Sequence, residues 1–304
     1  MIRIASFLVV NLFWFSLSSC GQKQATVGSI RLYESDVFKK YWYTGQAEIS
    51  SYHLQQSRYG EVREGEAVLI FVTEDFSKSK HVKLDDPGKA GNDKVSVLKM
   101  NFTKNFVTGI YPYSMMLSVF TPVQNPTTLK VTSSVQEWCG QVFCQMNLKG
   151  TRYQVAGYSY FEQEGDETFS IKQTWLEDEL WNMIRLAPAD LPVGSFEMIP
   201  GMFFSRLLHV KQMAHQAVGT RTENEDTVHY ELRIKDMERT LVIRFRKEFP
   251  HNILGWEETF VEQGQIQKTT ATLLKSLKTD YWTKNKNEHL PLRDSLGLLS
   301  PAKH

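Results

Sequence analysis

The chain has 304 residues, of which 41% are hydrophobic and 23% charged, a composition typical of a globular protein and unlike that of a disordered one. Its formal net charge of +1 provides no overall basic field, which argues against nucleic acid as a partner. The length allows one large β domain or two small ones.

The first twenty residues have the layout of a bacterial lipoprotein signal. Arg3 precedes an apolar run over residues 4–15, which is too short for a membrane-spanning helix. The sequence Leu17-Ser18-Ser19-Cys20 then resembles a lipobox. Resemblance to lipoproteins in general implies cleavage before Cys20 and acylation of its thiol. Two or three acyl chains would stabilise the attachment, because one chain holds a protein only marginally. An ordinary cleaved signal with a coincidental cysteine is the alternative.

A short helix is predicted after this anchor, and strand patterns follow it. Ser35 can cap a helix in which Phe38 and Trp42 share a face, and Gly45 ends it. Residues 67–72 form a continuous β-branched and aromatic run, typical of a buried strand. In this first half we expect strands over residues 47–59, 67–72, 95–102, 110–120, 129–137, 141–148 and 153–161.

One further helix is predicted between two β halves. Thr174 and Glu177 have the spacing of a capping box, and Leu180 and Ile184 recur at a helical interval before Pro188 ends the helix. Strands are then expected over residues 195–199, 203–210, 212–222, 227–235, 240–246, 254–262 and 269–279.

The succession of strands and turns predicts a mostly β fold, an antiparallel half-barrel or two-sheet sandwich with one or two short helices. The expected organisation is a signal peptide over residues 1–19, a lipidated tether over 20–34, a first β half with a C-terminal helix over 35–185, a second β half of the same domain over 186–282 and a polar tail over 283–304.

Five segments are distinctive: YWYTG at 41–45, AVLIFVTEDF at 67–76, TGIYPYS at 108–114, VQEWCG at 135–140 and ILGWEETF at 253–260. With these segments the chain resembles an uncharacterised family of bacterial envelope lipoproteins, some of which carry the label septum formation inhibitor Maf. The Ser-x-Ser-Pro-Arg-Arg phosphate loop of the Maf pyrophosphatases does not occur in this sequence. The resemblance therefore implies a place in the envelope, and it implies no pyrophosphatase activity.

Aromatic residues make up 12% of the chain, and two interpretations of them are open. They pack the core and its edges, or they line a concave groove for an acyl chain, a glycan or a partner peptide. The candidate groove residues are Tyr111, Tyr113, Trp138, Tyr158, Tyr160 and Trp256.

Two carboxylates beside tryptophans are the weak candidates for catalysis. Glu137 and Glu257 could act as the acid and base of a glycan hydrolase if they shared a cleft. Neighbours in a strand point to opposite faces, however, so each glutamate can equally face water while its tryptophan packs inside.

Cys139 and Cys144 are candidates for a disulfide, since an envelope compartment is oxidising. On one continuous strand they would point to opposite faces, so a bridge needs a turn or bulge near Gly140. Otherwise they are small buried hydrophobic residues. No histidine pairing or cysteine spacing indicates a metal site, and no motif indicates a cofactor.

These patterns predict a lipoprotein that is not an enzyme, anchored by Cys20 to the outer membrane and facing the periplasm. Its expected partners are the bilayer and either a hydrophobic ligand or an envelope protein, with no nucleic acid. A cell-wall hydrolase using Glu137 and Glu257, and a structural subunit of an envelope complex, are the alternatives.

Overall fold

The computed structural model describes residue 33 and residues 35–298. The predicted signal peptide, the lipidation site at Cys20 and the tether over 20–34, apart from Tyr33, lie outside the described residues. All statements below concern the compact unit that begins at Leu32.

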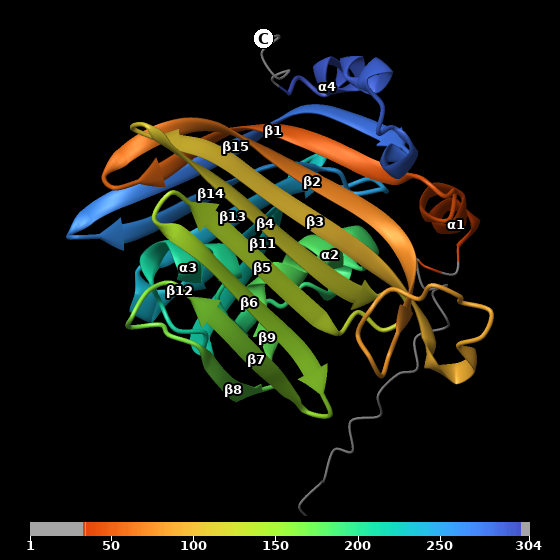
Figure 1. Cartoon of the computed structure of the whole chain (residues 1–304), viewed down its shortest axis with the longest axis horizontal. Helices are drawn as coiled ribbons and strands as arrows, with labels where there is room; N and C mark the ends of the chain where they lie inside the picture. The colour runs from red at the N-terminus through yellow and green to blue at the C-terminus, as the bar shows by residue number, and fades with distance from the viewer. Residues whose placement is uncertain (1–32, 34, 299–304) are drawn as a thin grey trace, which may run out of the picture. The chain divides into compact units, whose positions relative to one another are not determined.

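Fifteen strands form one sheet in the order β8-β7-β6-β5-β4-β3-β2-β1-β15-β14-β13-β12-β11-β10-β9 (Figure 1). The first arm of the sheet consists of β1 (Ala47–Arg58), β2 (Glu61–Ser77), β3 (Lys94–Thr108), β4 (Tyr111–Pro122), β5 (Lys130–Glu137), β6 (Gly140–Lys149), β7 (Arg152–Ser159) and β8 (Glu167–Lys172). The second arm consists of β9 (Trp175–Leu176), β10 (Gly194–Ile199), β11 (His215–Glu223), β12 (Thr227–Ile234), β13 (Arg239–Arg246), β14 (Ile253–Glu262) and β15 (Gln265–Thr279). Every pair is antiparallel except β9 with β10. The expected mostly β, antiparallel fold is confirmed.

The two arms meet at the pair β1–β15, and they also approach each other at the far edges. Only two residues separate the end of β8 at Lys172 from the start of β9 at Trp175. Consecutive Cα atoms are about 3.8 Å apart, so this link spans no more than about 11 Å. The edge strands of an unclosed sheet are therefore held close together, and the sheet has to curl.

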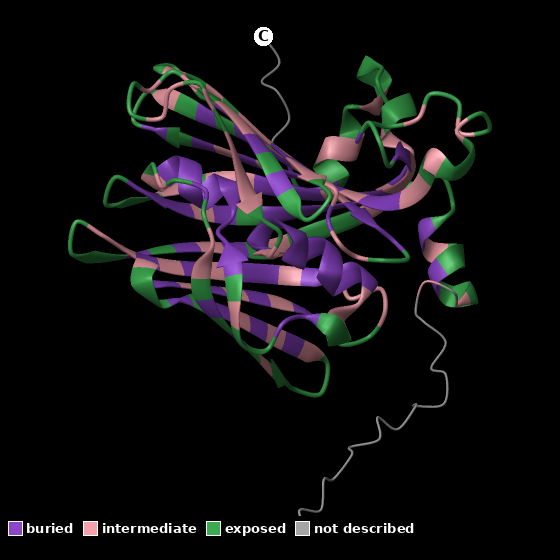
Figure 2. Ribbon diagram, turned by 90° about the horizontal axis from the view of Figure 1, so that it is seen from below, coloured by how far each residue is buried: buried purple, intermediate pink, exposed green. Residues whose placement is uncertain are grey.

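Four short α-helices occur among the described residues: α1 (Asp36–Trp42), α2 (Leu180–Leu186), α3 (Met202–Leu208) and α4 (Pro291–Ser295). Figure 2 shows buried helices lying between the two arms of the curled sheet. Because α2 and α3 fill the concave side, the architecture is that of a half-barrel around helices.

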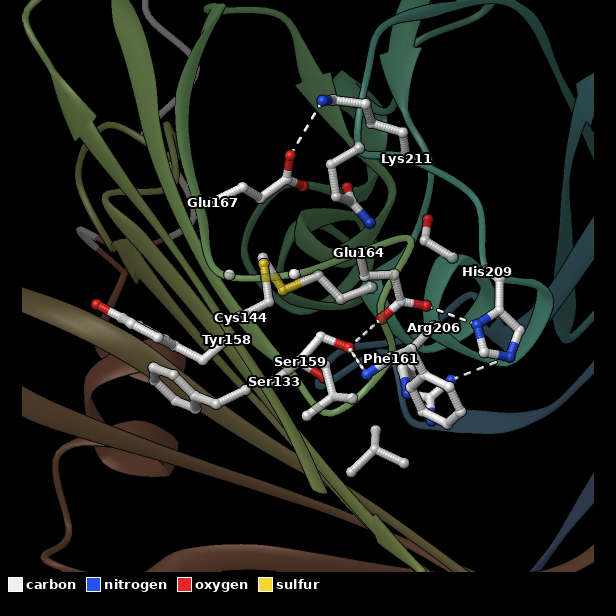
Figure 3. A pocket seen from close by; sticks show the side chains of 18 of the residues that line it. Ser133, Cys144, Tyr158, Ser159, Phe161, Glu164, Glu167, Arg206, His209 and Lys211 are labelled. Atoms are coloured by element: carbon white, nitrogen blue, oxygen red, sulfur yellow. Dashed lines mark hydrogen bonds and ion pairs between the residues drawn. The ribbon is translucent and has the colours of Figure 1, made fainter. Parts of the chain in front are cut away.

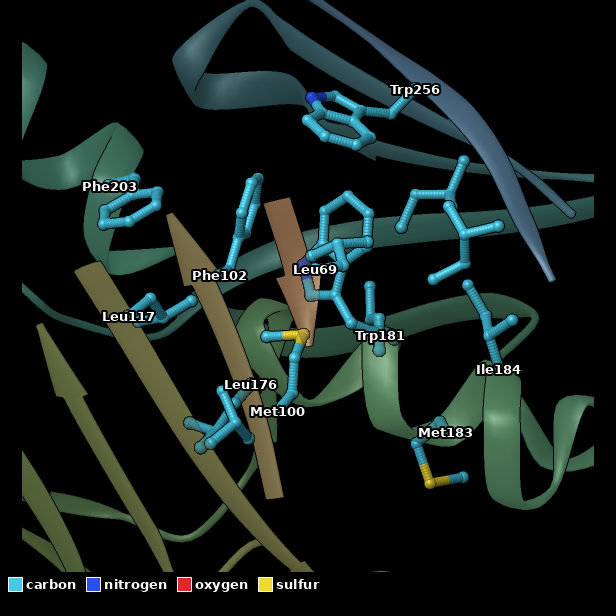
Figure 4. Packing of buried hydrophobic residues seen from close by; sticks show 14 of the residues in the cluster. Leu69, Met100, Phe102, Leu117, Leu176, Trp181, Met183, Ile184, Phe203 and Trp256 are labelled. Atoms are coloured by element: carbon cyan, nitrogen blue, oxygen red, sulfur yellow. The ribbon is translucent and has the colours of Figure 1, made fainter. Parts of the chain in front are cut away.

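The core lies between α2 and the inner face of the sheet (Figure 4). Trp181 of α2 packs edge-on against Phe102 of β3 and Trp256 of β14, with ring centroids 5.4 and 5.2 Å apart. All three side chains are buried. Strands from both arms therefore contact the same helix, and this contact joins the arms on the inside.

Two arginines are buried in ion pairs beside this core. Arg185 of α2 donates two hydrogen bonds of 2.6 Å to the carboxylate of Glu48. Arg239 of β13 binds Glu258 of β14 and Glu177, with an Nε–Oε1 distance of 2.8 Å to Glu258 and an Nη2–Oε1 distance of 2.7 Å to Glu177. A buried charge is tolerated when it is paired and hydrogen-bonded, and both arginines meet that condition.

The helix predicted from Ser35 is confirmed. The Ser35 hydroxyl accepts a 3.1 Å hydrogen bond from the Phe38 amide, and Phe38 and Trp42 are buried. The helix predicted near 174–188 is also present, but its capping carboxylate is Glu179, which accepts from the Leu176 amide at 3.0 Å.

The prediction of a strand over 203–210 is wrong, because α3 occupies Met202–Leu208. Nearly every residue of this helix is buried, and so it has no polar face to reveal a helical period in the sequence. The strand β8 was missed, since its residues are mostly half-exposed and polar.

The segment predicted as a polar tail is partly packed within its described residues. Leu296 and Leu298, which follow α4, are buried against Ile49, Val68 and Val72 on β1 and β2. The C-terminal segment therefore covers the outer face of the strands at the junction of the two arms.

Candidate functional site

A pocket of about 550 Å³ lies between the inner face of β5–β7, the loop after β7, and α3 (Figure 3). The strand register aligns two rows of inner-face residues across the three strands: Ser133–Cys144–Gly157 and Val135–Val142–Ser159. The sheet side of the pocket is therefore made of small and apolar side chains.

Gly157 makes room in the first row. A Cβ added at this glycine would meet only the Cγ of Glu167, at 3.6 Å, which is an ordinary van der Waals contact. The space in front of β7 is therefore open, and a larger side chain at position 157 would project into it.

The loop after β7 fixes an acidic group at one side of the pocket. The backbone carbonyl of Phe161 accepts hydrogen bonds from the amides of Glu164 and Gly165, at 3.1 and 2.9 Å. The Ser159 hydroxyl donates to Oε2 of Glu164 at 2.6 Å, and Nδ1 of His209 lies 2.6 Å from Oε1. Both oxygens of this carboxylate are thus occupied.

The opposite side of the pocket comes from α3, which buried acidic residues hold in place. The Met202 amide donates to Oδ2 of Asp178 at 3.0 Å, and Gly201 leaves room for the Glu177 and Asp178 carboxylates beside the helix start. The helix ends at His209, whose φ of 54° is left-handed. This placement brings Arg206 and His209 to the loop that carries Glu164 (Figure 3).

Arg206 is 9% exposed and lines the pocket, yet it has no ion pair among the described residues. Its guanidinium lies over the Phe161 ring, 4.4 Å from the centroid, and one Nη is 3.4 Å from Nε2 of His209. Its Nε has no hydrogen-bond partner. Burial lowers the pKa of Arg206, which the Glu164 carboxylate partly offsets.

Two further polar atoms at the pocket lack partners in the described structure. The Ser205 hydroxyl and Oε1 of Gln212 are buried without a hydrogen bond. Lys211 is different, because its Nζ lies 3.0 Å from a carboxylate oxygen of Glu167. The polar side of the pocket therefore combines one unpaired cation with two unsatisfied neutral groups.

Ser159, Glu164 and His209 do not have the geometry of a hydrolase triad. In a triad the serine donates to the histidine, and the carboxylate orients the other ring nitrogen. Here the serine and the histidine both bind the carboxylate. The arrangement fixes the loop to α3, and the Ser159 hydroxyl donates to a carboxylate and not to the histidine that a triad requires.

The two cysteines are free thiols in this structure. Cys144 faces the pocket, and burial raises its pKa to about 12. Cys139 is exposed in the turn after β5, where the Glu137 carboxylate raises its pKa. Neither sulfur is activated as a thiolate, which is the form required of a nucleophile.

The six predicted groove aromatics are not brought together. Tyr113 and Trp256 are buried in the core, and Tyr111 packs against it. Trp138, Tyr158 and Tyr160 are exposed, and Tyr158 stacks on Phe143 on the face of β6 and β7 opposite to the inner rows. Of the six, only Tyr158 is among the residues that line the pocket, and Phe143 and Phe161, which the sequence did not single out, line it as well.

Glu137 and Glu257 lie on opposite faces of the sheet. Glu137 has the strand parity of the inner residue Val135, whereas Glu257 alternates with the buried Trp256 and pairs with Lys268 on the outside, at 2.9 Å. Five strands separate β5 from β14. The structure does not bring these carboxylates into one cleft.

No protein-family model, curated protein or solved structure matches this chain. Within residues 33 and 35–298, no helix is long and apolar enough to cross a membrane. The same residues contain no group of three histidine, cysteine or acidic side chains that could hold a metal ion.

The residues that define the polar side of the pocket were not found from the sequence. Arg206 and His209 fell within the segment expected to be a strand, and Glu164 lay in a loop with no motif. The one available signal was the cluster Glu162, Glu164 and Glu167 around Gly165, which marked a polar loop beside a strand.

Proposed function

We propose that this protein is a lipid-anchored envelope lipoprotein, placed at the outer membrane and facing the periplasm, whose half-barrel binds a hydrophobic ligand without transforming it. The observation that carries the proposal is the pocket of about 550 Å³ on the concave side of the sheet. Ligand sites in proteins are concave, mostly apolar cavities of roughly 300–1,000 Å³ with a few placed polar groups.

The lining supports a ligand with an apolar body. Val135, Val142 and Met202 contribute aliphatic surface, and Phe161 contributes an aromatic face. Gly157 has no side chain, so the pocket extends to the backbone of β7 at this position. Burial of each methylene group contributes about 0.8 kcal/mol, so a medium-length alkyl chain would bind measurably.

Ligand binding can be tested with decan-1-ol as a neutral probe. The full-length lipoprotein, held in peptidiscs, should show a rise in melting temperature with decan-1-ol, because a ligand that binds only the folded state stabilises it. Gly157→Leu should fill the pocket and abolish the rise.

The matched control is Gln154→Leu, which changes an exposed residue on the opposite face of β7 that does not line the pocket. This variant should respond to decan-1-ol as the wild type does. An unchanged response of Gly157→Leu, or no response of the wild type to any alkyl probe, would refute binding in this pocket.

The anchor has a separate test. Cys20→Ser should abolish labelling by an alkyne analogue of palmitate and move the protein from the detergent-rich phase to the aqueous phase. Cys139→Ser is the control, since that thiol lies far along the chain in an exposed turn. Unaltered partitioning of Cys20→Ser would refute lipid anchoring.

An envelope protein partner is a second candidate, favoured by one end of the sheet. Tyr59, Ile110, Trp138, Tyr160 and Ile266 lie at or beside successive strand ends, and each is more than half exposed. The hairpin registers place all of them at the same end of the sheet. Clustered exposed apolar side chains mark interaction sites.

A photo-crosslinking residue at position 138 should give a discrete protein adduct in cells if this end binds a partner. The same residue at position 37, exposed on α1, is the control. Identical patterns from both positions would remove this candidate.

A further inference from the structure

The unpaired guanidinium of Arg206 defines the kind of ligand that the pocket accepts. We infer that the pocket binds an amphipathic anion, with its oxyanion head, a carboxylate or phosphate ester, on Arg206 and Ser205 and its apolar tail along the inner face of β5–β7. This inference rests on the proposed ligand-binding function and specifies its chemistry.

The first argument is that the other buried cations of this chain have oxygen atoms as hydrogen-bond partners. Arg185 and Arg239 each meet a carboxylate. Arg58 and Lys104 have no ion pair among the described residues, but both donate to oxygen atoms: Arg58 to the Leu207 carbonyl and two tyrosine hydroxyls, Lys104 to Oε1 of Gln56 at 3.2 Å. The closest polar contact of the Arg206 guanidinium is a histidine nitrogen at 3.4 Å.

The second argument is desolvation. A buried charge without a partner costs several kcal/mol, so proteins pair such groups or give them a ligand. Arg206 is nine-tenths buried and borders open space in the pocket. A planar guanidinium can bind carboxylate or phosphate oxygens through two parallel hydrogen bonds, and this makes an oxyanion a suitable partner.

The third argument is the pair of unsatisfied groups on either side. The hydroxyl of Ser205, next to Arg206 on α3, is buried with no partner and can donate to an oxyanion. The Gln212 amide lines the same pocket with its Oε1 unpartnered. An oxyanion can accept from the two donors, the Ser205 hydroxyl and Nε of Arg206, whereas Oε1 of Gln212 is itself an acceptor and requires a donor other than the anionic head.

Four acidic residues lie near this cation or line the pocket, Glu137, Glu162, Glu164 and Glu167, and the Glu164 carboxylate acts most strongly on Arg206. None of them forms an ion pair with Arg206 among the described residues. Both oxygens of Glu164 are engaged by Ser159 and His209, and Glu167 is paired with Lys211. The positive charge of Arg58 is close enough to lower the pKa of Arg206 further. An incoming anion would therefore meet one guanidinium that has no other anion bound to it.

Four decyl probes test the inference on the full-length lipoprotein in peptidiscs: decanoate, decyl phosphate, decan-1-ol and decyltrimethylammonium. Isothermal titration should show that decanoate or decyl phosphate binds at least tenfold more tightly than decan-1-ol, which corresponds to about 1.4 kcal/mol. Decyltrimethylammonium should bind most weakly. The preferred anion identifies the head as a fatty acid or a phosphate ester.

Arg206→Met should remove this preference, so that the anions bind no more tightly than decan-1-ol, whose affinity stays within about twofold of the wild-type value. Ser205→Ala should weaken only the anions, by a smaller factor. Arg233→Met is the matched control, because that cation pairs with Glu231 outside the pocket, and its anion preference should persist. Thermal unfolding verifies that each variant is folded.

The outcomes separate the two proposals. Equal affinity of the wild type for decanoate, decyl phosphate and decan-1-ol, or an anion preference that survives Arg206→Met, would overturn the amphipathic anion and leave ligand binding standing. Inorganic phosphate binding as tightly as decyl phosphate would overturn the apolar tail. Failure of every decyl probe to bind would refute the proposed function, and the inference would fall with it.

Discussion

Two buried arginines in the same half-barrel have opposite surroundings. Arg239 lies between Glu177 and Glu258 and is fully hydrogen-bonded to them. Arg206, on α3, lines a cavity and meets no carboxylate among the described residues. The comparison distinguishes Arg239, whose charge is paired within the fold, from Arg206, whose charge is available to a ligand.

The position of each arginine follows from the topology. Arg239 and Glu258 are on adjacent strands of the second arm, and η3 (Glu177–Glu179) brings Glu177 to them as the chain enters α2. Arg206 faces strands of the first arm, whose inner residues at that level are serine, valine, cysteine and glycine. The second arm therefore provides a carboxylate beside Arg239, whereas the first arm provides only small side chains and open space beside Arg206.

The largest effect should come from breaking the paired arginine. Arg239→Met leaves two buried carboxylates without a cation, so we expect the free energy of unfolding to fall by about 3–5 kcal/mol. Urea denaturation measures this. Arg233→Met, at an exposed pair with Glu231, is the control, and its loss should stay below about 1 kcal/mol. A loss below about 1 kcal/mol for Arg239→Met would contradict the stabilising role.

A second prediction concerns the acidic side of the buried cluster. Burial and the adjacent Glu177 carboxylate raise the pKa of Asp178 to about 8. The folded state then holds this proton more tightly than the unfolded state, so ionisation of Asp178 reduces stability as the pH rises from the ordinary aspartate range towards 8. Asp178→Asn removes the ionisation and keeps an acceptor for the Met202 amide.

The stability of Asp178→Asn relative to the wild type should therefore increase from pH 5 to pH 8, by at least about 1 kcal/mol. Urea denaturation at both pH values measures the difference. Asp226→Asn, at an exposed position, should show no such trend. A difference that is constant or falls with pH would show that Asp178 is ionised in the folded protein throughout this range.

The unpaired arginine should behave in the opposite way to Arg239. Arg206→Met removes a desolvated cation that forms no ion pair with the described residues, so the unfolding free energy of the ligand-free protein should rise, and it should in no case fall by more than about 1 kcal/mol. Urea denaturation under the conditions used for Arg239→Met allows direct comparison. A loss as large as that of Arg239→Met would mean that Arg206 stabilises the fold, and the distinction between the two arginines would disappear.

The smallest effect is expected on the outer face. Lys268 pairs with Glu257 at 2.9 Å, with side chains 55% and 40% exposed. Lys268→Met should change the unfolding free energy by no more than about 0.5 kcal/mol, because solvent screens exposed pairs. A larger loss would show that an exposed ion pair can also stabilise this fold, and that exposure does not predict how much a charge contributes.

The strands were predictable where one face is buried and the other is wet. β12 and β13 alternate in burial along their length, and their sequence positions were close to those expected. The helix α3 was not predictable in this way, because nearly all its residues are buried, Ser205 and Arg206 included, so it has no exposed polar face, and a short, largely apolar run fits a buried strand equally well.

The pocket could not be predicted, because it depends on the order of strands in the sheet. Glu164 and His209 are 45 residues apart in the chain, and they meet only because the sheet curls around α3. Of the candidate residues chosen from the sequence, only Tyr158 and Cys144 line the pocket. The residues that line the pocket include serine, glycine and cysteine, and nothing in their local sequence distinguishes them.

The pair β1–β15 has a consequence for how the chain reaches its native state. Ala47 pairs with Thr279, so the central seam of the sheet joins segments more than 200 residues apart. Non-local pairing of this kind slows folding, because a long loop has to close before the contact stabilises anything. The two arms cannot pair along β1 and β15 until the residues of β15 have been synthesised. The first arm pairs strands that follow one another in the chain, so its hairpins can form early, and the two arms join only after β15 has been made.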